Sequence, residues 1–157
     1  MELITIKTPE EIEKMRAAGR LTARARALAG SMIRPGVTTG EIDREVHKFI
    51  RGHGAKPSFL GYGGFPGSIC ASVNEVVIHG IPGSRRLEEG DIVSIDVGAY
   101  LHGFHGDCAA TFPCGKVSAE ARQLMEVTRE SFWKGIAQAK AGNRVRDIGH
   151  AVQQYVE

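Results

Sequence analysis

Hydrophobic residues recur at helical spacing in two stretches at the start of the chain. Thr8-Pro9-Glu10-Glu11 combines an N-cap residue, a proline at the first helical position and a capping-box glutamate, so a helix is predicted from here to Pro35-Gly36. Residues 38–41 repeat the capping signal and open a second helix that ends near residues 52–54. The pattern therefore predicts two antiparallel helices, with apolar stripes formed by Ile12, Met15, Leu21, Ala25, Leu28 and Met32 in the first and by Ile42, Val46, Phe49 and Ile50 in the second.

The middle of the chain changes to the two-residue alternation of strands. Residues 68–73 form one predicted strand, and residues 91–112 form a predicted hairpin with Leu101 and His102 at its tip. A third helix is predicted from Ser118 to Gly142 and a fourth from about Arg146, with apolar positions at Leu124, Val127, Phe132 and Ile136 in the third and at Ile148, Ala151, Val152, Tyr155 and Val156 in the fourth. Helices, an antiparallel sheet and then helices, without strand–helix–strand alternation, predict an α+β fold.

Two aspartates in the predicted hairpin are the best clue to function. With the tip at Leu101 and His102, Asp96 is predicted to lie directly opposite Asp107, on the polar side of the sheet. Like charges at opposed positions destabilise a sheet, so the pair needs a shared proton or a cation. We favour a metal; an acid dyad, or two solvated aspartates separated by a bulge, are the alternatives.

Composition places the chain among ordinary globular proteins. It has 157 residues, 42% of them hydrophobic and 24% charged, which suits one domain of enzyme size. The three cysteines, Cys70, Cys108 and Cys114, have no Cys-x-x-Cys spacing, which argues against a disulfide framework or a zinc knuckle. With no signal-peptide pattern and no apolar run of membrane-spanning length, we expect a cytoplasmic protein that is neither secreted nor membrane-inserted.

The first predicted helix is strongly basic although the net charge is only +2. The stretch from Lys14 to Arg34 contains no acidic residue, and Arg16, Arg20 and Arg24 fall on one helical stripe. Such a stripe could contact RNA or another polyanion. A solvated helix face is the more common explanation and the one we favour.

His79 ends the apolar run of residues 74–82, where Gly80 and Pro82 make the chain turn. A histidine at a strand end beside glycine can point into a cleft, where it could bind metal, move a proton or donate a hydrogen bond to an oxyanion. A purely structural histidine is equally compatible with this pattern. Of the other histidines, only His105 invites a ligand hypothesis, because it shares strand parity with Asp107.

Residues 59–67 place aromatic side chains among glycines. Phe59, Tyr62 and Phe65 in this frame could line an apolar pocket for a side chain. The alternative is a loop whose aromatics pack on the core. It is not a phosphate-binding loop, because it lacks the Gly-x-x-x-x-Gly-Lys-Ser/Thr pattern.

Taken together, these segments resemble a known family. Residues 59–66, 68–82, 90–97 and 102–107, in this order, look very much like a bacterial-type (type I) methionine aminopeptidase, and the resemblance runs the whole length of the chain. It implies a pita-bread fold of two pseudo-symmetric halves with a two-metal centre in the cleft between them. It also implies removal of the initiator methionine from nascent chains whose second residue is small.

The resemblance assigns roles to individual residues. Asp96 and Asp107 match two metal ligands, the first chelating one ion and the second bridging both. His79 matches a histidine that contacts the substrate and steadies the tetrahedral intermediate. The remaining matches are to the methionine side-chain pocket, formed by Tyr62, Phe65 and Cys70 with Phe59 at its rim. Carboxylate and imidazole ligands suit Mn, Fe, Co or Zn alike, so the two divalent ions are not identified.

The resemblance also implies that this chain lacks some of the family's metal ligands. In the family, one histidine and two glutamates from the C-terminal half complete the metal centre, and this chain ends before them. We therefore expect residues 1–157 to be the N-terminal half of a methionine aminopeptidase, inactive alone and prone to self-association through its uncovered cleft face. The full-length form is expected to be a monomer.

Two other functions compete with this interpretation. The first is a non-catalytic pita-bread-like half that binds a peptide or a ribosomal surface through the basic first helix. The second is a relative that cleaves next to proline, although residues 74–82 fit the methionine enzymes better by resemblance. The presence of Asp96, Asp107 and His79 together favours the enzyme, because a binding module needs none of them.

Overall fold

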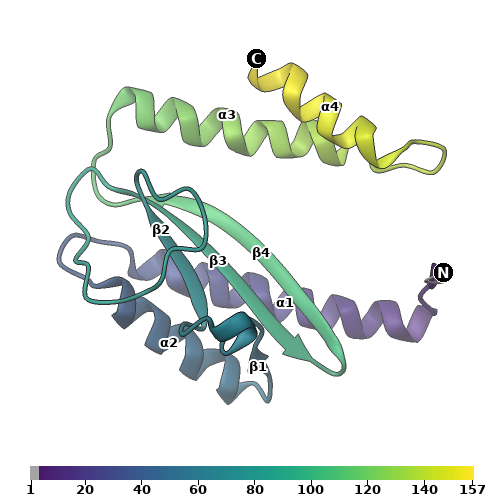
Figure 1. The fold of residues 1–157 in the computed structure, drawn as a ribbon, viewed down its shortest axis with the longest axis horizontal. Helices are drawn as coiled ribbons and strands as arrows, with labels where there is room; N and C mark the ends of the chain where they lie inside the picture. The colour runs from purple at the N-terminus through teal and green to yellow at the C-terminus, as the bar shows by residue number, and fades with distance from the viewer. Residues whose placement is uncertain (1–3) are drawn as a thin grey trace. The chain divides into compact units, whose positions relative to one another are not determined.

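A computed structural model describes residues 4–157 (Figure 1), which fall into two compact units, one up to Lys116 and one from Val117 to Glu157. The first unit contains two helices, a short 3-10 turn and four strands: α1 (Pro9–Met32), α2 (Thr39–Gly52), β1 (Lys56–Pro57), η1 (Tyr62–Gly64), β2 (Ile69–Val73), β3 (Ile92–Leu101) and β4 (Phe104–Pro113). The second unit contains α3 (Ala119–Ile136) and α4 (Val145–Val156). The predicted order of elements is confirmed, apart from the two-residue strand β1, which the sequence pattern did not indicate.

Both N-terminal helices begin where the capping signals predicted. The Thr8 side chain accepts a hydrogen bond from the Glu11 amide while the Glu11 carboxylate accepts one from the Thr8 amide. Thr38 and Glu41 repeat this reciprocal pair at the start of α2. Each box satisfies two backbone donors that a helix start would otherwise leave free, so these boundaries are set by local chemistry.

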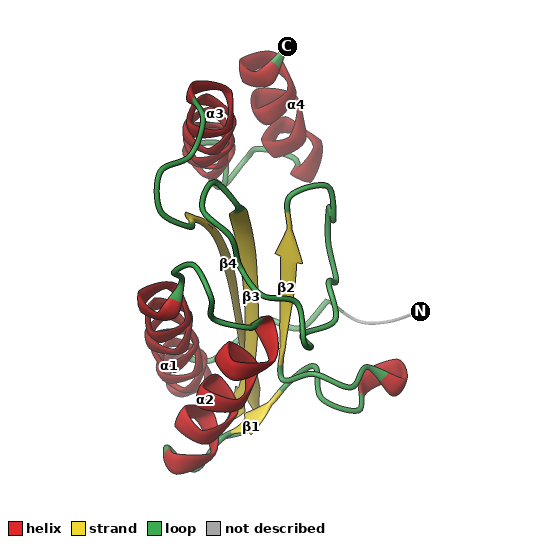
Figure 2. Cartoon of the chain, turned by 90° about the vertical axis from the view of Figure 1, so that its left-hand side faces the viewer, coloured by secondary structure: helices red, strands yellow, loops and turns green. Residues whose placement is uncertain are grey.

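The sheet is antiparallel throughout and is centred on β3. Strands β1 and β2 pair with one edge of β3, and β4 pairs with the other. Helices α1 and α2 lie together on one side of the sheet (Figure 2). The apolar side chains of β2 and β3 point toward them and form the core with residues of both helices; its fully buried members include Ala25, Ile42, Val46, Ile50, Ile69, Val93, Ile95 and Val97.

The hairpin between β3 and β4 has a different register from the predicted one. Leu101 pairs with Phe104, so the turn residues are His102 and Gly103, both with positive φ (52° and 89°). A two-residue hairpin turn of this kind needs positive φ at both positions, which glycine accepts readily and leucine does not. The predicted tip at Leu101 and His102 is therefore wrong by one residue, and the predicted direct pairing of Asp96 with Asp107 is wrong by two.

The second unit is a pair of packed helices. Ser118 caps α3, as predicted, by accepting a hydrogen bond from the Ala121 amide. The helix ends at Ile136, several residues before the predicted end at Gly142. Gly135 lies against Val152 and Ile148 of α4, because the missing side chain lets the two helices approach closely.

The predicted apolar stripe of α3 is not buried. Leu124, Phe132 and Ile136 are exposed, and the buried residues of this helix are Ser131 and Gly135. The small residues, rather than the large apolar ones, therefore lie at the contact with α4. Among the helices of residues 4–157, none combines the length and the apolar character that crossing a bilayer requires.

Candidate metal and substrate site

Asp96 and Asp107 lie on the side of the hairpin that faces away from α1. Asp107 pairs with Gly98, which is two residues after Asp96 on the same strand, so the two aspartates are diagonal neighbours on one face. A register shift of two residues keeps the parity of both strands, because side chains alternate with a period of two. The structure thus brings the two predicted ligands together, although not as a directly opposed pair.

Asp96 occupies an unfavourable environment for a charged group. Its Oδ1 is buried and has no hydrogen-bond partner within residues 4–157. Burial raises the pKa of Asp96 above its ordinary value, and the neighbouring Asp107 carboxylate raises it further. His79 and the Val97 backbone amide oppose this rise in the pKa. An unsatisfied carboxylate oxygen next to a second carboxylate is an arrangement that a cation would stabilise.

Cys70 lies next to Asp96, on the side away from β4. It lies on β2 and pairs directly with Asp96, on the same face of the sheet. Burial, followed by the charges of Asp96 and Asp107, raises the pKa of the Cys70 thiol to about 11. The side chain is therefore a neutral, apolar group at neutral pH, which suits the wall of a pocket and not a nucleophile.

His79 lies in a loop. The prediction that it lies at the end of a strand is wrong. No residue between Asn74 and Pro82 belongs to a regular strand, and His79 itself has φ of 56°. Backbone conformations of this kind are uncommon for residues other than glycine and concentrate at functional sites. His79 opposes the rise in the pKa of Asp96, which agrees with an imidazole near the carboxylates.

Gly80 fixes the loop that carries His79 to the edge of β2. Its carbonyl oxygen accepts a hydrogen bond from the Ala71 amide at 2.9 Å, and its amide donates to Ser72 Oγ at 3.0 Å. A Cβ at position 80 would collide with the Ala71 carbonyl oxygen. The close approach therefore requires glycine, and it sets the position of the neighbouring His79.

The aromatic loop lies beside the same face. A Cβ at Gly98 would lie 2.7 Å from Phe59 Cε1, so the Phe59 ring occupies the space above the strand position that faces Asp107. Tyr62 is largely exposed, Phe65 is half-buried, and none of the three aromatic residues belongs to the core cluster. This placement favours pocket lining over packing of the aromatics on the core.

His105 has a partner in the protein through one of its ring nitrogens. Its Nδ1 lies 2.8 Å from Ser58 Oγ, and its ring lies against the ring of Tyr100 with 4.7 Å between centroids. Ser58 directly precedes Phe59, so this contact ties the start of the aromatic loop to β4. The sequence suggested a ligand here because parity alone cannot reveal a partner 47 residues away.

The basic stripe of α1 is partly used within the protein. Arg24 lies over the Phe49 ring and contacts His53, while Arg16 forms a bridge with Glu13. Arg26, outside the stripe, donates to the Ala109 carbonyl oxygen at 2.9 Å. These intramolecular contacts favour a structural role for most of the arginines, and contact with a polyanion stays a prediction.

The donor set fits a metal centre only in part. Two carboxylates with an unsatisfied oxygen suit divalent ions such as Mn, Fe, Co or Zn. Within residues 4–157, however, no three His, Cys, Asp or Glu side chains come together as a metal-binding group. The site as it stands has part of a ligand set, and further ligands are needed for tight binding.

Comparison with known proteins gives a consistent result. The sequence matches Metallopeptidase family M24 over residues 13–157. Methionine aminopeptidase 1 of Bacillus subtilis (strain 168) is 52% identical over 155 residues, which are 99% of this chain and 62% of that protein.

Solved structures show the same relation. The methionine aminopeptidase of Rickettsia prowazekii superimposes with a TM-score of 0.95 at 42% identity, over 98% of this chain and 62% of that one. A Xaa-Pro dipeptidase from Bacillus anthracis gives 0.84 at 28% identity, over 96% and 41%. The α+β pita-bread fold, with the first half present, is confirmed, and the chain spans about 62% of the length of these methionine aminopeptidases.

Proposed function

The chain belongs to metallopeptidase family M24, and from this premise we propose that it forms part of a methionine aminopeptidase. The reaction is hydrolysis of the first peptide bond of a nascent protein, which releases the initiator methionine when the second residue is small. The observation that carries the proposal is the buried Oδ1 of Asp96, which has no hydrogen-bond partner among the described residues, next to the second carboxylate of Asp107. The three free cysteines agree with the cytoplasm as the proposed location.

In the proposal, Asp96 and Asp107 hold two divalent ions. When bound, such ions lower the pKa of a water molecule and polarise the scissile carbonyl. The two aspartates would contribute fixed negative charge for the ions, because the β3–β4 ladder holds both residues in place. Cation binding would also remove the repulsion that raises the pKa of Asp96.

His79 is proposed to bind the substrate at the reacting carbonyl. Its imidazole can donate a hydrogen bond to the oxygen that gains negative charge as the carbonyl carbon becomes tetrahedral. The support is its nearness to Asp96 and its restrained backbone, because Gly80 holds the loop on β2. A donor that is held in place before reaction loses little free energy on reorganisation.

The methionine side chain is proposed to enter a pocket formed by Cys70, Tyr62 and Phe65, with Phe59 at its rim. Cys70 supplies a buried, neutral thiol, and thioether–thiol and thioether–aromatic contacts are favourable for an unbranched, polarizable side chain. Phe59 stands next to the strand position opposite Asp107, so the pocket and the carboxylates border each other.

We further propose that residues 1–157 alone are inactive. Two aspartates without a third ligand would bind divalent ions weakly, and the relatives are longer than this chain. The test compares the 157-residue chain with a chimera that joins it to the remaining C-terminal part of the Bacillus subtilis enzyme. Release of methionine from Met-Ala-Ser is measured for both in the presence of Mn or Co.

The expected result is no turnover by the chain and clear turnover by the chimera. Asp96→Asn in the chimera should lower kcat/KM by about 100-fold or more, because it removes a metal-binding oxygen. The matched control is Glu75→Gln, an exposed acid of the same unit, which should leave kcat/KM unchanged. An inactive chimera that folds cooperatively would contradict the proposal and favour the non-catalytic binding module.

A further inference from the structure

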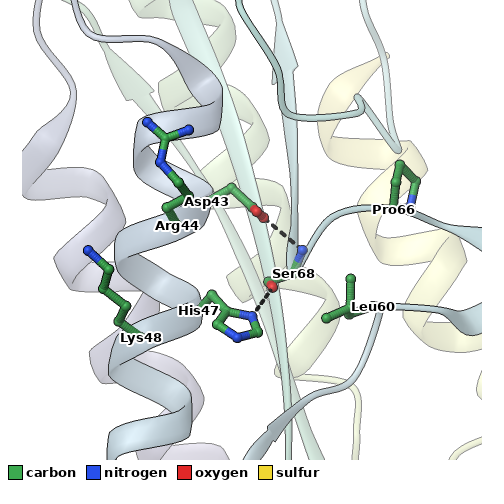
Figure 3. Close-up of a pocket in the computed structure, with 7 residues that line it drawn as sticks. All are labelled: Asp43, Arg44, His47, Lys48, Leu60, Pro66 and Ser68. Carbon is green, nitrogen blue, oxygen red and sulfur yellow. Dashed lines mark hydrogen bonds between the residues drawn. The ribbon is translucent and has the colours of Figure 1, made fainter.

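Two side chains of α2 form hydrogen bonds with Ser68, just before β2, and with Ile69, the first residue of β2 (Figure 3). Asp43 Oδ1 accepts from the Ser68 amide at 2.7 Å and from the Ile69 amide at 3.0 Å. One turn later, His47 Nδ1 lies 2.8 Å from Ser68 Oγ. We call these three hydrogen bonds the α2 clamp.

The clamp satisfies backbone groups that the sheet leaves free. Strand β2 lies at the edge of the sheet, since β3 is its one strand partner within residues 4–157. Along its outer edge, the Ile69 amide donates to Asp43 and the Ala71 amide donates to Gly80. Ser68 and Ile69 are both almost fully buried, so loss of the Asp43 oxygen would leave two buried donors without a partner.

The α2 clamp ties the end of the aromatic loop to α2. An open pocket of about 320 Å³ separates α2 from this loop. The pocket is lined by the residues that Figure 3 shows: Asp43, Arg44, His47, Lys48, Leu60, Pro66 and Ser68. Across this open space, the three hydrogen bonds at residues 68 and 69 restrain the end of the loop, together with the burial of Ile69 in the core that α2 helps to form.

Both neighbours of the clamp along the chain belong to the proposed methionine pocket. Cys70 follows Ile69 directly, and Phe65 lies three residues before Ser68. A displacement of the clamped segment would move the thiol and the aromatic ring together. The chemistry of the carboxylates would be affected less, because Asp96 and Asp107 are held by the β3–β4 ladder.

We propose that Asp43, assisted by His47, is a positioning residue that sets the shape of the methionine side-chain pocket. The inference rests on the proposed function for the identity of the ligand, a methionine side chain at a peptide N-terminus. It goes beyond that function by assigning substrate selection to α2, whose residues do not touch the reacting atoms.

The first test measures the clamp without using activity. The 157-residue chain is treated with iodoacetamide, and alkylation of each cysteine is followed by peptide mass spectrometry. Asp43→Ala should raise the rate at the buried Cys70 about tenfold, whereas Cys114 in the core should not change. Asp43→Asn keeps the acceptor oxygen and should stay within about threefold of the parent. Arg44→Ala, a change in the same pocket with no hydrogen bond to β2, is the matched control.

Alkylation of Cys70 at the parent rate in Asp43→Ala would overturn the inference. If Asp43→Ala exposes Cys114 as well, the variant has unfolded, and His47→Ala then decides. Selective exposure of Cys70 in His47→Ala supports the clamp, and an unchanged rate there overturns it.

The second test separates pocket shape from chemistry in the chimera described above. Asp43→Ala should raise KM for Met-Ala-Ser about tenfold and change kcat by less than about twofold, with partial rescue by Asp43→Asn. Unchanged kinetic constants in an active chimera would overturn the positioning role. If the parent chimera has no activity, the proposed function fails, and the cysteine measurement still decides whether the clamp holds the pocket residues.

Discussion

The two faces of β3 have opposite surroundings. On one face, Val93, Ile95 and Val97 are fully buried against the core. On the other, the half-buried Asp96 has a carboxylate oxygen without a partner among the described residues. Burial of the apolar face stabilises the fold, and this offsets the unfavourable burial of the Asp96 carboxylate on the other face. The difference indicates that packing of the apolar face keeps the hairpin rigid. The rigid hairpin then holds the carboxylates of Asp96 and Asp107 close together, although their charges repel each other.

The largest expected effect is on the core face. Ile95→Ala should lower the free energy of unfolding by about 3 kcal/mol, because it removes buried methylene groups and leaves a cavity between the sheet and the helices. Ser94→Ala, the adjacent residue on the other face, is the control and should change it by less than about 0.5 kcal/mol. Both are measured by urea denaturation. Equal losses would show that the two faces do not differ in energetic role.

The next effect compares two glycines on opposite faces of the hairpin. A Cβ at Gly106 would lie 2.5 Å from the Ala18 carbonyl oxygen of α1, whereas a Cβ at Gly98 would meet two residues of the loop, Phe59 at 2.7 Å and Ser58 Cβ at 2.8 Å. Helix backbone cannot move aside as easily as an aromatic ring in a loop. Gly106→Ala should therefore destabilise the chain by about 2 to 3 kcal/mol, and Gly98→Ala by about 1 kcal/mol.

Thermal and urea unfolding of the two glycine variants measure this difference. A matched substitution at Gly52, where a Cβ would meet nothing within 4 Å, controls for the change in backbone entropy. A larger loss for Gly98→Ala than for Gly106→Ala would mean that the aromatic loop is more rigid than the contact with α1.

Much of this comparison could be predicted from the sequence, because the deciding interactions are local. The reciprocal Thr8–Glu11 bonds join residues three apart, and alternation along β3 identified its buried face. The hairpin register was not predictable in the same way. It depended on whether Gly103 occupies the turn, and the alternating pattern is equally compatible with a shift of two residues.

The rest of the site depends on contacts between segments far apart in the chain. Asp43 holds amides 25 and 26 residues away, and His105 binds Ser58 across 47 residues. Aspartate in an amphipathic helix is normally a solvated residue, so nothing in the spacing distinguishes Asp43 from its exposed neighbours. A useful signal would have been the edge position of β2, whose outer amides require partners from elsewhere.

The third effect is a gain of stability from a change on the face of the hairpin that carries Asp96 and Asp107, which we call the open face. The folded-state pKa of Asp96 lies above its ordinary value, so ionisation of this group opposes folding. Its contribution is favourable below the unfolded pKa of about 3.9 and is lost as the pH rises through the folded pKa. Asp96→Asn should therefore stabilise the chain by on the order of 1 kcal/mol at pH 7.5, since an asparagine amide can donate to Asp107.

Urea denaturation at pH 4 and pH 7.5 checks the sign of this effect. The gain for Asp96→Asn should shrink toward pH 4, where the parent carboxyl is increasingly protonated. Glu75→Gln replaces an exposed acid and should show no such dependence. A loss of stability at pH 7.5 would mean that the carboxylate of Asp96 is satisfied in solution and does not need a cation.

The smallest effect on stability concerns the exposed apolar residues of the loop that carries His79. Val77 is 84% exposed and Ile81 is 64% exposed, so their contacts contribute little to the folded state of the chain. Val77→Ser combined with Ile81→Ser should change the free energy of unfolding by less than about 0.5 kcal/mol.

The same pair of changes should lower the self-association that we predict for the chain, because exposed apolar area near the open face drives association. Sedimentation velocity over a range of concentrations measures this, with Ser84→Ala in the same loop region as the control. A parent chain that is monomeric at every concentration would show that the open face is stable in water without a covering segment. It would also remove the main physical argument that another surface covers this face.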